Sequence, residues 1–259
     1  MKHSLTLEIQ SQPNDSSCGP TCLAAVYRYW DDIVDLNRVI SEVGQLPTGG
    51  ALAVQLGCHA LERGYDAVLT TYNLQVFDPT WFDAGDGIGD QGRLAEKLAQ
   101  QYEVKSLRPG VDQERLRAAT DSYLRFLSLG GRIQMRLLDD SLIVDTLTQE
   151  IPMLCGLSAT YLYQEPRERS QPPDRMGRTG IPDDIAGDPV GHFVVMHGFD
   201  PQTRSVLIAD PLYPNPFATT HQYVAPLPRV ASAIMLGVVT YDANLLAIVP
   251  CEVEPPRAP

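Results

Sequence analysis

The sequence predicts an α+β domain in which an N-terminal helical lobe precedes a C-terminal lobe built on a β-sheet. Through the first half of the chain, apolar residues recur at helical spacing. In the second half they form short runs rich in Val, Ile, Leu and Tyr, as β-strands do. Helices first and strands later argue against alternating βαβ units. With 259 residues, 44% of them hydrophobic, the chain can bury the core of one large domain.

The helices are predicted in chain order. Residues 1–17 lack helix signals and end in a polar loop, whereas from Cys18 onward apolar residues follow a helical period and Pro20 occupies a first-turn position. Further helices are predicted at 35–43, 52–63, 90–102, 112–128 and 140–149. Four acidic residues at their starts are expected to be N-caps or first-turn acids, namely Asp35, Asp90, Asp112 and Asp140.

Strands are predicted in the remainder of the chain, at 151–163, 192–199, 206–209, 235–241 and 245–249. The helical lobe then covers about 18–149 and the sheet lobe about 150–250, in a single domain of residues 1–250. Residues 164–190, rich in proline and charge, are expected to form an insertion loop between two strands. Residues 251–259 are expected to be a flexible tail.

Charge and apolar patterning exclude several functional classes. The chain has 32 acidic and 20 basic residues, a net charge of −12 and a pI near 4.7, which argues against a generic nucleic-acid binder. No apolar run approaches the roughly 18 residues of a membrane span. An acid, Glu8, stands where a signal peptide has its apolar stretch, so we expect a cytoplasmic protein without nucleic-acid or membrane partners.

Five cysteines, an odd number in a long chain, argue against a disulfide scaffold. Cys18 stands out because it opens a predicted helix, where unpaired N–H groups and the helix dipole favour a thiolate. Gly19 would allow other groups to approach the sulfur. Gln12 would donate, together with the Cys18 N–H, to an oxyanion hole. The alternative is that Cys18 is a small buried apolar residue; Cys22, Cys155 and Cys251 are expected to be buried by packing.

A second group of polar residues lies on a predicted hairpin with a turn at 200–204. If Phe199 pairs with Ser205, Val194 faces Asp210, and His192 lies diagonally from Asp210 on the same face of the sheet. Asp210 would then accept the imidazole N–H and direct the other ring nitrogen at the thiol. A shift of one residue in the pairing would separate the two side chains.

The other histidines are expected to be structural or on the surface. His197 lies on the opposite face of the predicted strand from His192, and the remaining three are His3, His59 and His221.

In their order and spacing these residues resemble the papain-like cysteine peptidases, specifically the bacteriocin-processing (double-glycine leader) peptidases and their stand-alone relatives. The resemblance implies a papain-like fold with the nucleophile helix packed on an antiparallel sheet. It implies that Cys18 is the nucleophile, Gln12 the oxyanion-hole donor, His192 the general base and acid, and Asp210 its orienting group. No motif matches from about 65 to 140. The matching segments are Gln12, Cys18-Gly19-Pro20 with Cys22-Leu23, Glu150 to Leu154, His192-Phe193-Val194-Val195 before Gly198-Phe199, and Asp210-Pro211.

These residues predict a thiol hydrolase that cleaves a peptide, isopeptide or amide bond through a thioester, with no cofactor and a peptide-like substrate. An acyl or peptidyl transferase using the same thioester, and a peptide-binding module without turnover, remain alternatives. A structural zinc site at Cys18, Cys22, Cys58 and His59 is a weaker one, because adjacent helical residues such as Cys58 and His59 point about 100° apart.

The insertion at 164–190 ends at Gly191, next to the predicted base. One expectation is therefore a lid in which Asp183, Asp184, Asp188 and Gly191 contact substrate and favour a positive charge. The other is a passive surface insertion.

Overall fold

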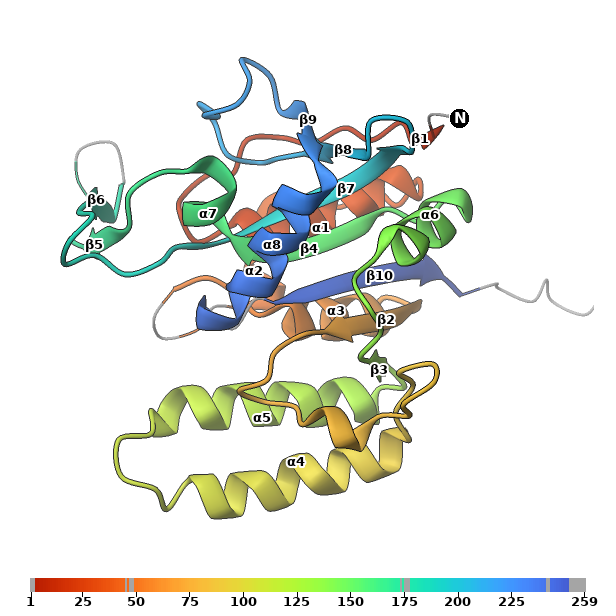
Figure 1. Ribbon diagram of the computed structural model, residues 1–259, viewed down its shortest axis with the longest axis vertical. Coiled ribbons are helices and arrows are strands. Elements are labelled where there is room, and N and C mark those ends of the chain that lie inside the picture. Colours follow the sequence, from red (N-terminus) through yellow and green to blue (C-terminus); the bar gives the residue numbers. More distant parts are fainter. Residues whose placement is uncertain are drawn as a thin grey trace, which may run out of the picture.

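A central β-sheet organises the protein, which is described by a computed structural model over residues 3–44, 46, 49–172, 174, 178–240 and 243–251 (Figure 1). The strand order is β3-β2-β10-β4-β7-β8-β9, and β1 pairs with β7. Neighbouring strands are antiparallel except β2 and β3. The sheet strands are β1 (His3–Ser4), β2 (Tyr65–Thr71), β3 (Arg132–Gln134), β4 (Met153–Ser158), β7 (Gly191–Asp200), β8 (Ser205–Ala209), β9 (Gln222–Pro226) and β10 (Asn244–Pro250).

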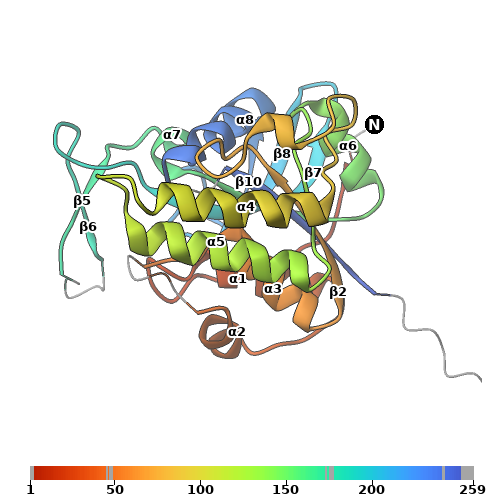
Figure 2. The same ribbon diagram turned by 90° about the horizontal axis from the view of Figure 1, so that it is seen from below.

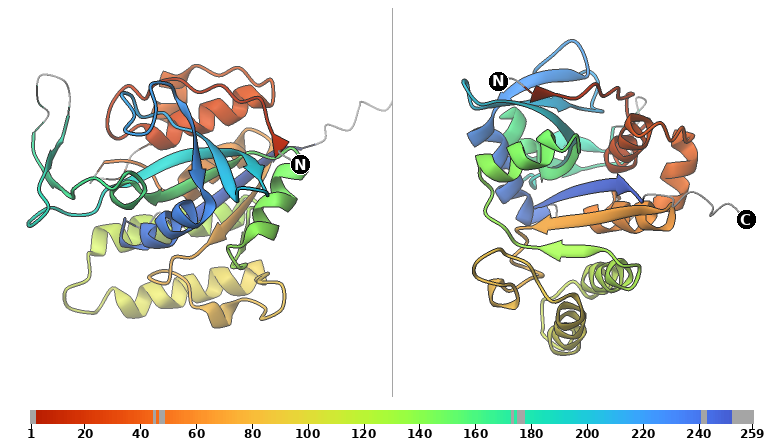
Figure 3. Two further views of the ribbon diagram at one scale, coloured as in Figure 1. Left: turned by 45° about the horizontal axis from the view of Figure 1, so that its top comes forward. Right: turned by 90° about the vertical axis from the view of Figure 1, so that its right-hand side faces the viewer.

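Helices cover both faces of this sheet. On one face lie α1 and α3, with α5 packed on α3 and α4 on α5 (Figure 2). On the other face lie α6, α7 and α8 (Figure 3). The helices are α1 (Cys18–Tyr29), α2 (Leu36–Val43), α3 (Ala53–Glu62), α4 (Gln91–Lys105), α5 (Gln113–Ser128), α6 (Asp140–Thr148), α7 (Ala159–Tyr163) and α8 (Leu227–Leu236), with short 3-10 turns η1 (Pro79–Trp81) and η2 (Gly237–Thr240).

Both faces of the central strands are buried, so the core is divided in two by the sheet. Leu154 of β4 belongs to the cluster beneath α1 and α3, whereas its neighbour Cys155 belongs to the cluster beneath α8. This alternation is the period of two expected for a strand, with apolar side chains on both sides. It explains why these strands are continuous apolar runs in the sequence.

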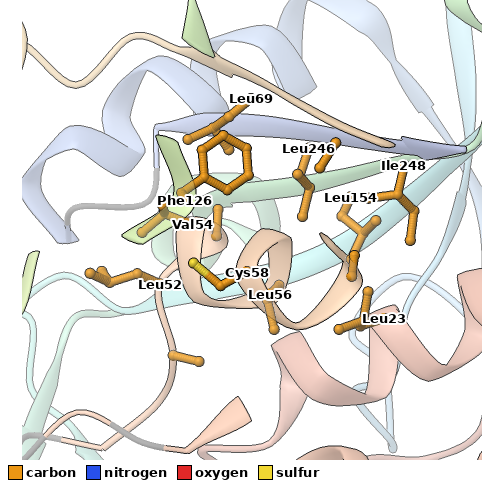
Figure 4. Close-up of a cluster of buried hydrophobic side chains, with 14 of the residues drawn as sticks. Leu23, Leu52, Val54, Leu56, Cys58, Leu69, Phe126, Leu154, Leu246 and Ile248 are labelled. Atoms are coloured by element: carbon orange, nitrogen blue, oxygen red, sulfur yellow. The ribbon is translucent and has the colours of Figure 1, made fainter. Parts of the chain in front are cut away.

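The larger cluster fills the space between α3, α5 and the sheet (Figure 4). Leu69 of β2 and Leu246 of β10 face this cluster and are fully buried. Gly57 of α3 lies so close to α5 that a Cβ atom there would be 2.5 Å from the Phe126 ring. The absence of a side chain at this position therefore sets how closely the two helices pack.

The α+β class is confirmed, and so are the six predicted helices, with shifts of a few residues at their ends. Asp35, Asp90 and Asp112 are N-caps, each accepting a hydrogen bond from the backbone N–H three residues later. Asp140 is a first-turn acid, since the N-cap of α6 is Asp139.

Two predicted strands are wrong in part or entirely. The strand predicted at 151–163 ends at Ser158, whose hydroxyl accepts from Tyr161 N and caps α7. The segment predicted as a strand at 235–241 is the end of α8 followed by η2, with residue 241 outside the described part of the chain. One local and one tertiary feature favour the helix: Pro228 fits the first turn of α8, and the apolar face of that helix packs on β4.

The lobes are also less separate than the sequence predicts, because β2 and β3 come from the segment predicted as the helical lobe and extend the sheet. The insertion contains a two-stranded hairpin of its own, β5 (Glu168–Ser170) and β6 (Gly180–Pro182). Of the predicted flexible tail, residues 252–259 lie outside the described residues. Within the described ranges, the structure contains no helix with the length and apolar character needed to cross a membrane.

Candidate active site

Cys18 is the first residue of α1 and lies at the start of a helix that has no side-chain cap. Pro20 has no N–H, so Cys18 and Gly19 supply the backbone donors of this first turn. Gly19 lies against the rest of the protein: a Cβ atom there would be 3.2 Å from Leu56 Cδ1 and 3.3 Å from Phe193 Cδ2. The glycine therefore lets α1 pack closely on α3 and β7, which fixes the position of the thiol.

The hairpin of β7 and β8 brings His192 and Asp210 together by a route that differs from the predicted one. Ser205 pairs with Asp200, one residue away from the assumed partner Phe199. A bulge between Met196 and Gly198 then shifts the register by one residue, so that Val195 faces Ala209. Beyond the bulge the pairing follows the predicted register as far as Val195 and Ala209, and Asp210 is the residue directly after β8.

His192 donates from Nε2 to Asp210 Oδ1 at 2.9 Å, in a buried pair. Oδ1 also accepts from the Leu212 backbone N–H at 2.9 Å. The second oxygen, Oδ2, accepts from the hydroxyls of Tyr163 at 2.5 Å and Tyr223 at 2.8 Å. Four hydrogen bonds therefore hold the carboxylate, which offsets the cost of burying its charge.

This arrangement shifts the pKa values of both partners. Burial by itself would lower the pKa of His192, but the charge and hydrogen bond of Asp210, and the interaction with the neighbouring Cys18 as acceptor, raise it to about 10. Burial by itself would raise the pKa of Asp210, but the charge and hydrogen bond of His192 outweigh it and lower that pKa. Since Nε2 is bonded to Asp210, Nδ1 is the ring nitrogen left for an exchange of a proton with Cys18.

Cys18 and His192 open onto a cavity of about 780 Å³. A larger cavity of about 1280 Å³ lies elsewhere, around Tyr72 and α8, and contains neither residue, so the chemistry of the side chains, not cavity size, marks the site. The smaller cavity is lined by the loop before α1, by residues 49–52, by the β5–β6 hairpin at Ser170, Gln171 and Thr179, by the start of β7 at Gly191, His192 and Phe193, and by Leu46, Arg115 and Thr240.

Gln12 lies close to this region but does not line the cavity. Its backbone N–H donates to Pro211 O at 2.9 Å, which ties it to the segment after Asp210. Its side-chain Nε2 donates to Asn14 O at 3.1 Å. In this arrangement the amide is directed at the loop before α1, and its role as an oxyanion-hole donor stays a prediction.

Of the residues expected to contact substrate from the insertion, only Gly191 lines the cavity. The Asp183 side chain closes a turn by accepting from Ile185 N and Ala186 N. The backbone of Asp188 pairs with that of Glu168 in an isolated antiparallel β-bridge. Asp184 is exposed, and like the other two it is outside the cavity lining. The structure therefore does not place these three carboxylates where a substrate bound at Cys18 would meet them.

The insertion nevertheless reaches the site by a different contact. Asp15, in the loop before Cys18, accepts from Thr179 N at 2.9 Å and from Thr179 Oγ1 at 3.1 Å. These bonds fasten the base of β6 to the loop that precedes the thiol. The hairpin projects beyond the start of β7, at the left of Figure 1.

The remaining thiols have other surroundings. Cys22 and Cys155 are buried as predicted, and burial raises the pKa of Cys155 to about 12. The expectation that Cys251 is buried is wrong: it follows the end of β10 and is exposed, because the strand ends at Pro250. Cys58 donates to Ser122 O at 3.6 Å.

His59 bonds Tyr27 and Glu42, so the side chains considered for zinc point to separate partners. Over the described ranges, no three His, Cys, Asp or Glu side chains are grouped to hold a metal ion.

Sequence reasoning missed the residues that support the Asp210 carboxylate. Tyr163 falls in a segment predicted as strand, and Tyr223 in one without a predicted element. His221 donates from Nδ1 to Asp210 O at 2.8 Å, and its own carbonyl accepts from Asp210 N at 2.8 Å. The sequence indicates only that a buried carboxylate needs several hydrogen-bond donors, and this general rule does not identify which residues supply them.

Comparisons with known proteins identify the family. A model of the Peptidase_C39 like family matches residues 4–225. A crystal structure from Bacillus anthracis, described as a C39-like peptidase, is 14% identical, with 96% of this chain and 98% of that chain covered and a TM-score of 0.47. A double glycine motif protease from an AMS/PCAT transporter, in complex with the leader peptide, is 13% identical over 96% and 95%, with a TM-score of 0.44.

Xylellain, a cysteine protease from Xylella fastidiosa, is 14% identical over 97% of this chain and 86% of that chain, with a TM-score of 0.42. A search of curated proteins finds no match. The family match spans most of the sequence, from β1 to β9, and includes every residue of the proposed site. The chain belongs to the Peptidase_C39 like family.

Proposed function

We propose that the protein is a cysteine hydrolase that cleaves a peptide, isopeptide or amide bond with a triad of Cys18, His192 and Asp210. The observation that carries the proposal is the position of His192, which is hydrogen-bonded to a buried carboxylate and lines the same cavity as a thiol at a helix start. The cavity at Cys18 gives a substrate access to the sulfur. Covalent acyl transfer requires a nucleophile, a base next to it, and a third group that orients the base.

In the proposed reaction, the Cys18 thiolate attacks the scissile carbonyl, and the imidazolium of His192 holds the proton that the leaving amine will need. As the tetrahedral intermediate collapses, the C–N bond breaks, His192 donates its proton to the amine, and a thioester on Cys18 remains. His192 then takes a proton from water as the water oxygen attacks the thioester. The acid product leaves and the thiolate with its imidazolium is regenerated.

The developing negative charge on the carbonyl oxygen needs donors during both attacks. The Cys18 N–H at the start of α1 supplies one. In the proposal Gln12 supplies the second, by exchanging its present acceptor, Asn14 O, for the oxyanion. The Gln12→Ala variant should then lower kcat by about 10²-fold, the size measured for loss of one such donor in other hydrolases.

An electrophilic peptide-like probe tests the proposed nucleophile. It is best applied in a Cys251→Ser background, because Cys251 is exposed and would react independently. Intact-mass measurement should show one adduct on Cys18, none in the Cys18→Ala variant, and much slower labelling in His192→Ala. Stoichiometric labelling of Cys22, Cys58 or Cys155 with Cys18 unmodified would exclude the assignment.

A further inference from the structure

His221 connects two parts of the proposed site without lining its cavity. Its ring donates from Nδ1 to Asp210 O at 2.8 Å, and its own carbonyl accepts from Asp210 N at 2.8 Å. The other ring nitrogen, Nε2, is bonded to the hydroxyl of Ser11 at 3.1 Å. Since a carbonyl oxygen can only accept, Nδ1 carries the proton, and Nε2 of the neutral ring accepts from Ser11. His221 therefore binds both polar atoms of the Asp210 backbone and reaches Ser11 as well.

Ser11 belongs to an N-terminal segment that runs past β8 and β9 before it reaches the thiol (Figure 1). Gln12 follows Ser11 directly, and its backbone N–H donates to Pro211 O at 2.9 Å. The segment is therefore fastened at two neighbouring points, through His221 at Ser11 and directly at Gln12. One hydrogen bond would let the segment pivot, whereas two bonds at neighbouring residues also fix its orientation.

We infer that His221 is a positioning residue, which holds the Gln12 amide at a fixed place relative to the Asp210 carboxylate. The inference rests on the proposed function, in which Gln12 binds the oxyanion and Asp210 orients the base. The two groups act on different parts of one transition state, so a displacement of about 1 Å between them is costly. His221 does not line the cavity, so it acts on the chemistry only through these two residues.

Two reagents that attack the same sulfur test the contact with Ser11 without any natural substrate. p-Nitrophenyl acetate acylates a thiolate through a tetrahedral oxyanion and releases p-nitrophenolate, whereas iodoacetamide alkylates the thiolate by direct displacement of iodide and forms no oxyanion. The background is Cys251→Ser, because Cys251 is exposed, and the rates of Cys18→Ala are subtracted. The ratio of acylation to alkylation then reports the oxyanion donors.

Ser11→Ala and His221→Asn should each lower this ratio about tenfold, with the iodoacetamide rate little changed. Both variants break the bond between Ser11 and the ring, since the amide nitrogen of the asparagine takes the place of Nδ1 and reaches Asp210 O alone. If His221 acts through Gln12, Ser11→Ala should have no further effect in a Gln12→Ala background. A further fall in that background, or an unchanged ratio in Ser11→Ala alone, would overturn the inference.

Gln222→Ala is the matched control. Gln222 adjoins His221 and is exposed, and its side-chain amide fastens the same N-terminal segment by donating to Leu7 O at 2.7 Å. Its removal takes away a bond to the segment but none to the site, so the ratio should stay at its starting value. An equal fall in Gln222→Ala and Ser11→Ala would overturn the specific role of His221, because any loosening of the segment would then have the same effect.

The contact with Asp210 has a separate readout in the NMR titration of His192, measured in Cys18→Ala. His221→Gln places its amide nitrogen at the position of Nε2, so it keeps the bond to Ser11 and loses the one to Asp210 O. The His192 imidazole should then bind its proton about threefold less tightly, the effect of one lost hydrogen bond behind the carboxylate. In His221→Asn, which keeps that bond, the titration should not move. Equal titrations in the two variants would overturn the positioning of Asp210.

The two readouts also separate this inference from the proposed function. A parent protein whose Cys18 reacts with neither reagent would overturn the hydrolase, and the His192 titration would then decide the role of His221. If neither His221 variant folds by circular dichroism, the ratio in Ser11→Ala decides it, because Ser11 is exposed and its hydroxyl can be removed without disturbing the core.

Discussion

The charge of Asp210 should determine whether His192 is protonated, and Asp210→Asn removes that charge with little change in shape. The oxygen of an asparagine can still accept from His192 and from the Leu212 N–H. Its NH₂ group would meet the hydroxyls of Tyr163 and Tyr223, which can accept as well as donate. The hydrogen bonds therefore persist in the variant, and the electrostatic effect is isolated.

The magnitude follows from the pKa of His192, which is raised from its usual 6.5 to about 10. Each tenfold change in proton affinity corresponds to ~1.4 kcal/mol, so the upper limit of the stabilisation is ~5 kcal/mol. Because the folded pKa is the higher one, this stabilisation is complete below pH 6.5 and is lost as the pH rises to 10. The lowered pKa of Asp210 gives the opposite dependence in acid, with stabilisation present above 3.8 and lost as the pH falls.

Urea unfolding of Cys18→Ala and of Cys18→Ala with Asp210→Asn measures the effect without interference from the thiol. The difference in unfolding free energy should be several kcal/mol at pH 6.5 and should approach zero at pH 10. In parallel, the imidazole NMR signals of His192 should titrate below 6.5 in the asparagine variant, where burial is no longer opposed by a charge. A free-energy difference that does not change with pH, or an unchanged imidazole titration, would refute the reasoning.

Three further changes test other contacts. Tyr163→Phe removes a hydrogen bond to the buried carboxylate and should lower the unfolding free energy by about 2 kcal/mol in urea titrations; a loss below a few tenths would contradict that bond. Gly57→Ala places a methyl group against the Phe126 ring and should lower the unfolding free energy by about 1–3 kcal/mol, measured from the shift in the urea midpoint. An unchanged midpoint would contradict the close packing of α3 on α5. Asp15→Ala should release the hairpin, so the Thr179 amide should exchange with deuterium more than about tenfold faster, while an unchanged rate would mean that other contacts hold it.

The parts of the fold that depend on local signals were predictable. Helix starts at Asp35, Asp90 and Asp112 follow from the hydrogen bond that an aspartate side chain makes to its own helix. The placement of Cys18 at a helix start follows from Pro20, which is compatible only with the first turn. These features need no knowledge of the rest of the chain.

The parts of the fold that depend on tertiary contacts could not be predicted from the sequence. Strand β9 is a short edge strand whose alternate residues are exposed, so its sequence carries little signal. The segment from Met235 has β-branched residues typical of a strand, but it forms the end of α8 and the 3-10 turn η2, which both pack on β4.

At the candidate site, the pairing of His192 with Asp210 was predicted from a hairpin register that is wrong at its turn. The bulge next to His197 adds one residue to β7 and restores the relation. No rule applied to the sequence locates such a bulge. That Arg115 lines the cavity was not predictable for a related reason, because the segment around it matches no motif and reaches the cavity only through the packing of α5.

The position of β10 has a consequence for how the protein acquires its fold during synthesis. This strand lies between β2 and β4 and pairs with both, although it is the last strand of the described chain. Until it has been translated, β2 with β3 and β4 with its neighbours are separate pieces with exposed edges. The nascent protein therefore carries Cys18 for most of its synthesis without a completed sheet, and a ribosome stalled before residue 244 should hold a chain that is sensitive to proteases and lacks a reactive thiol.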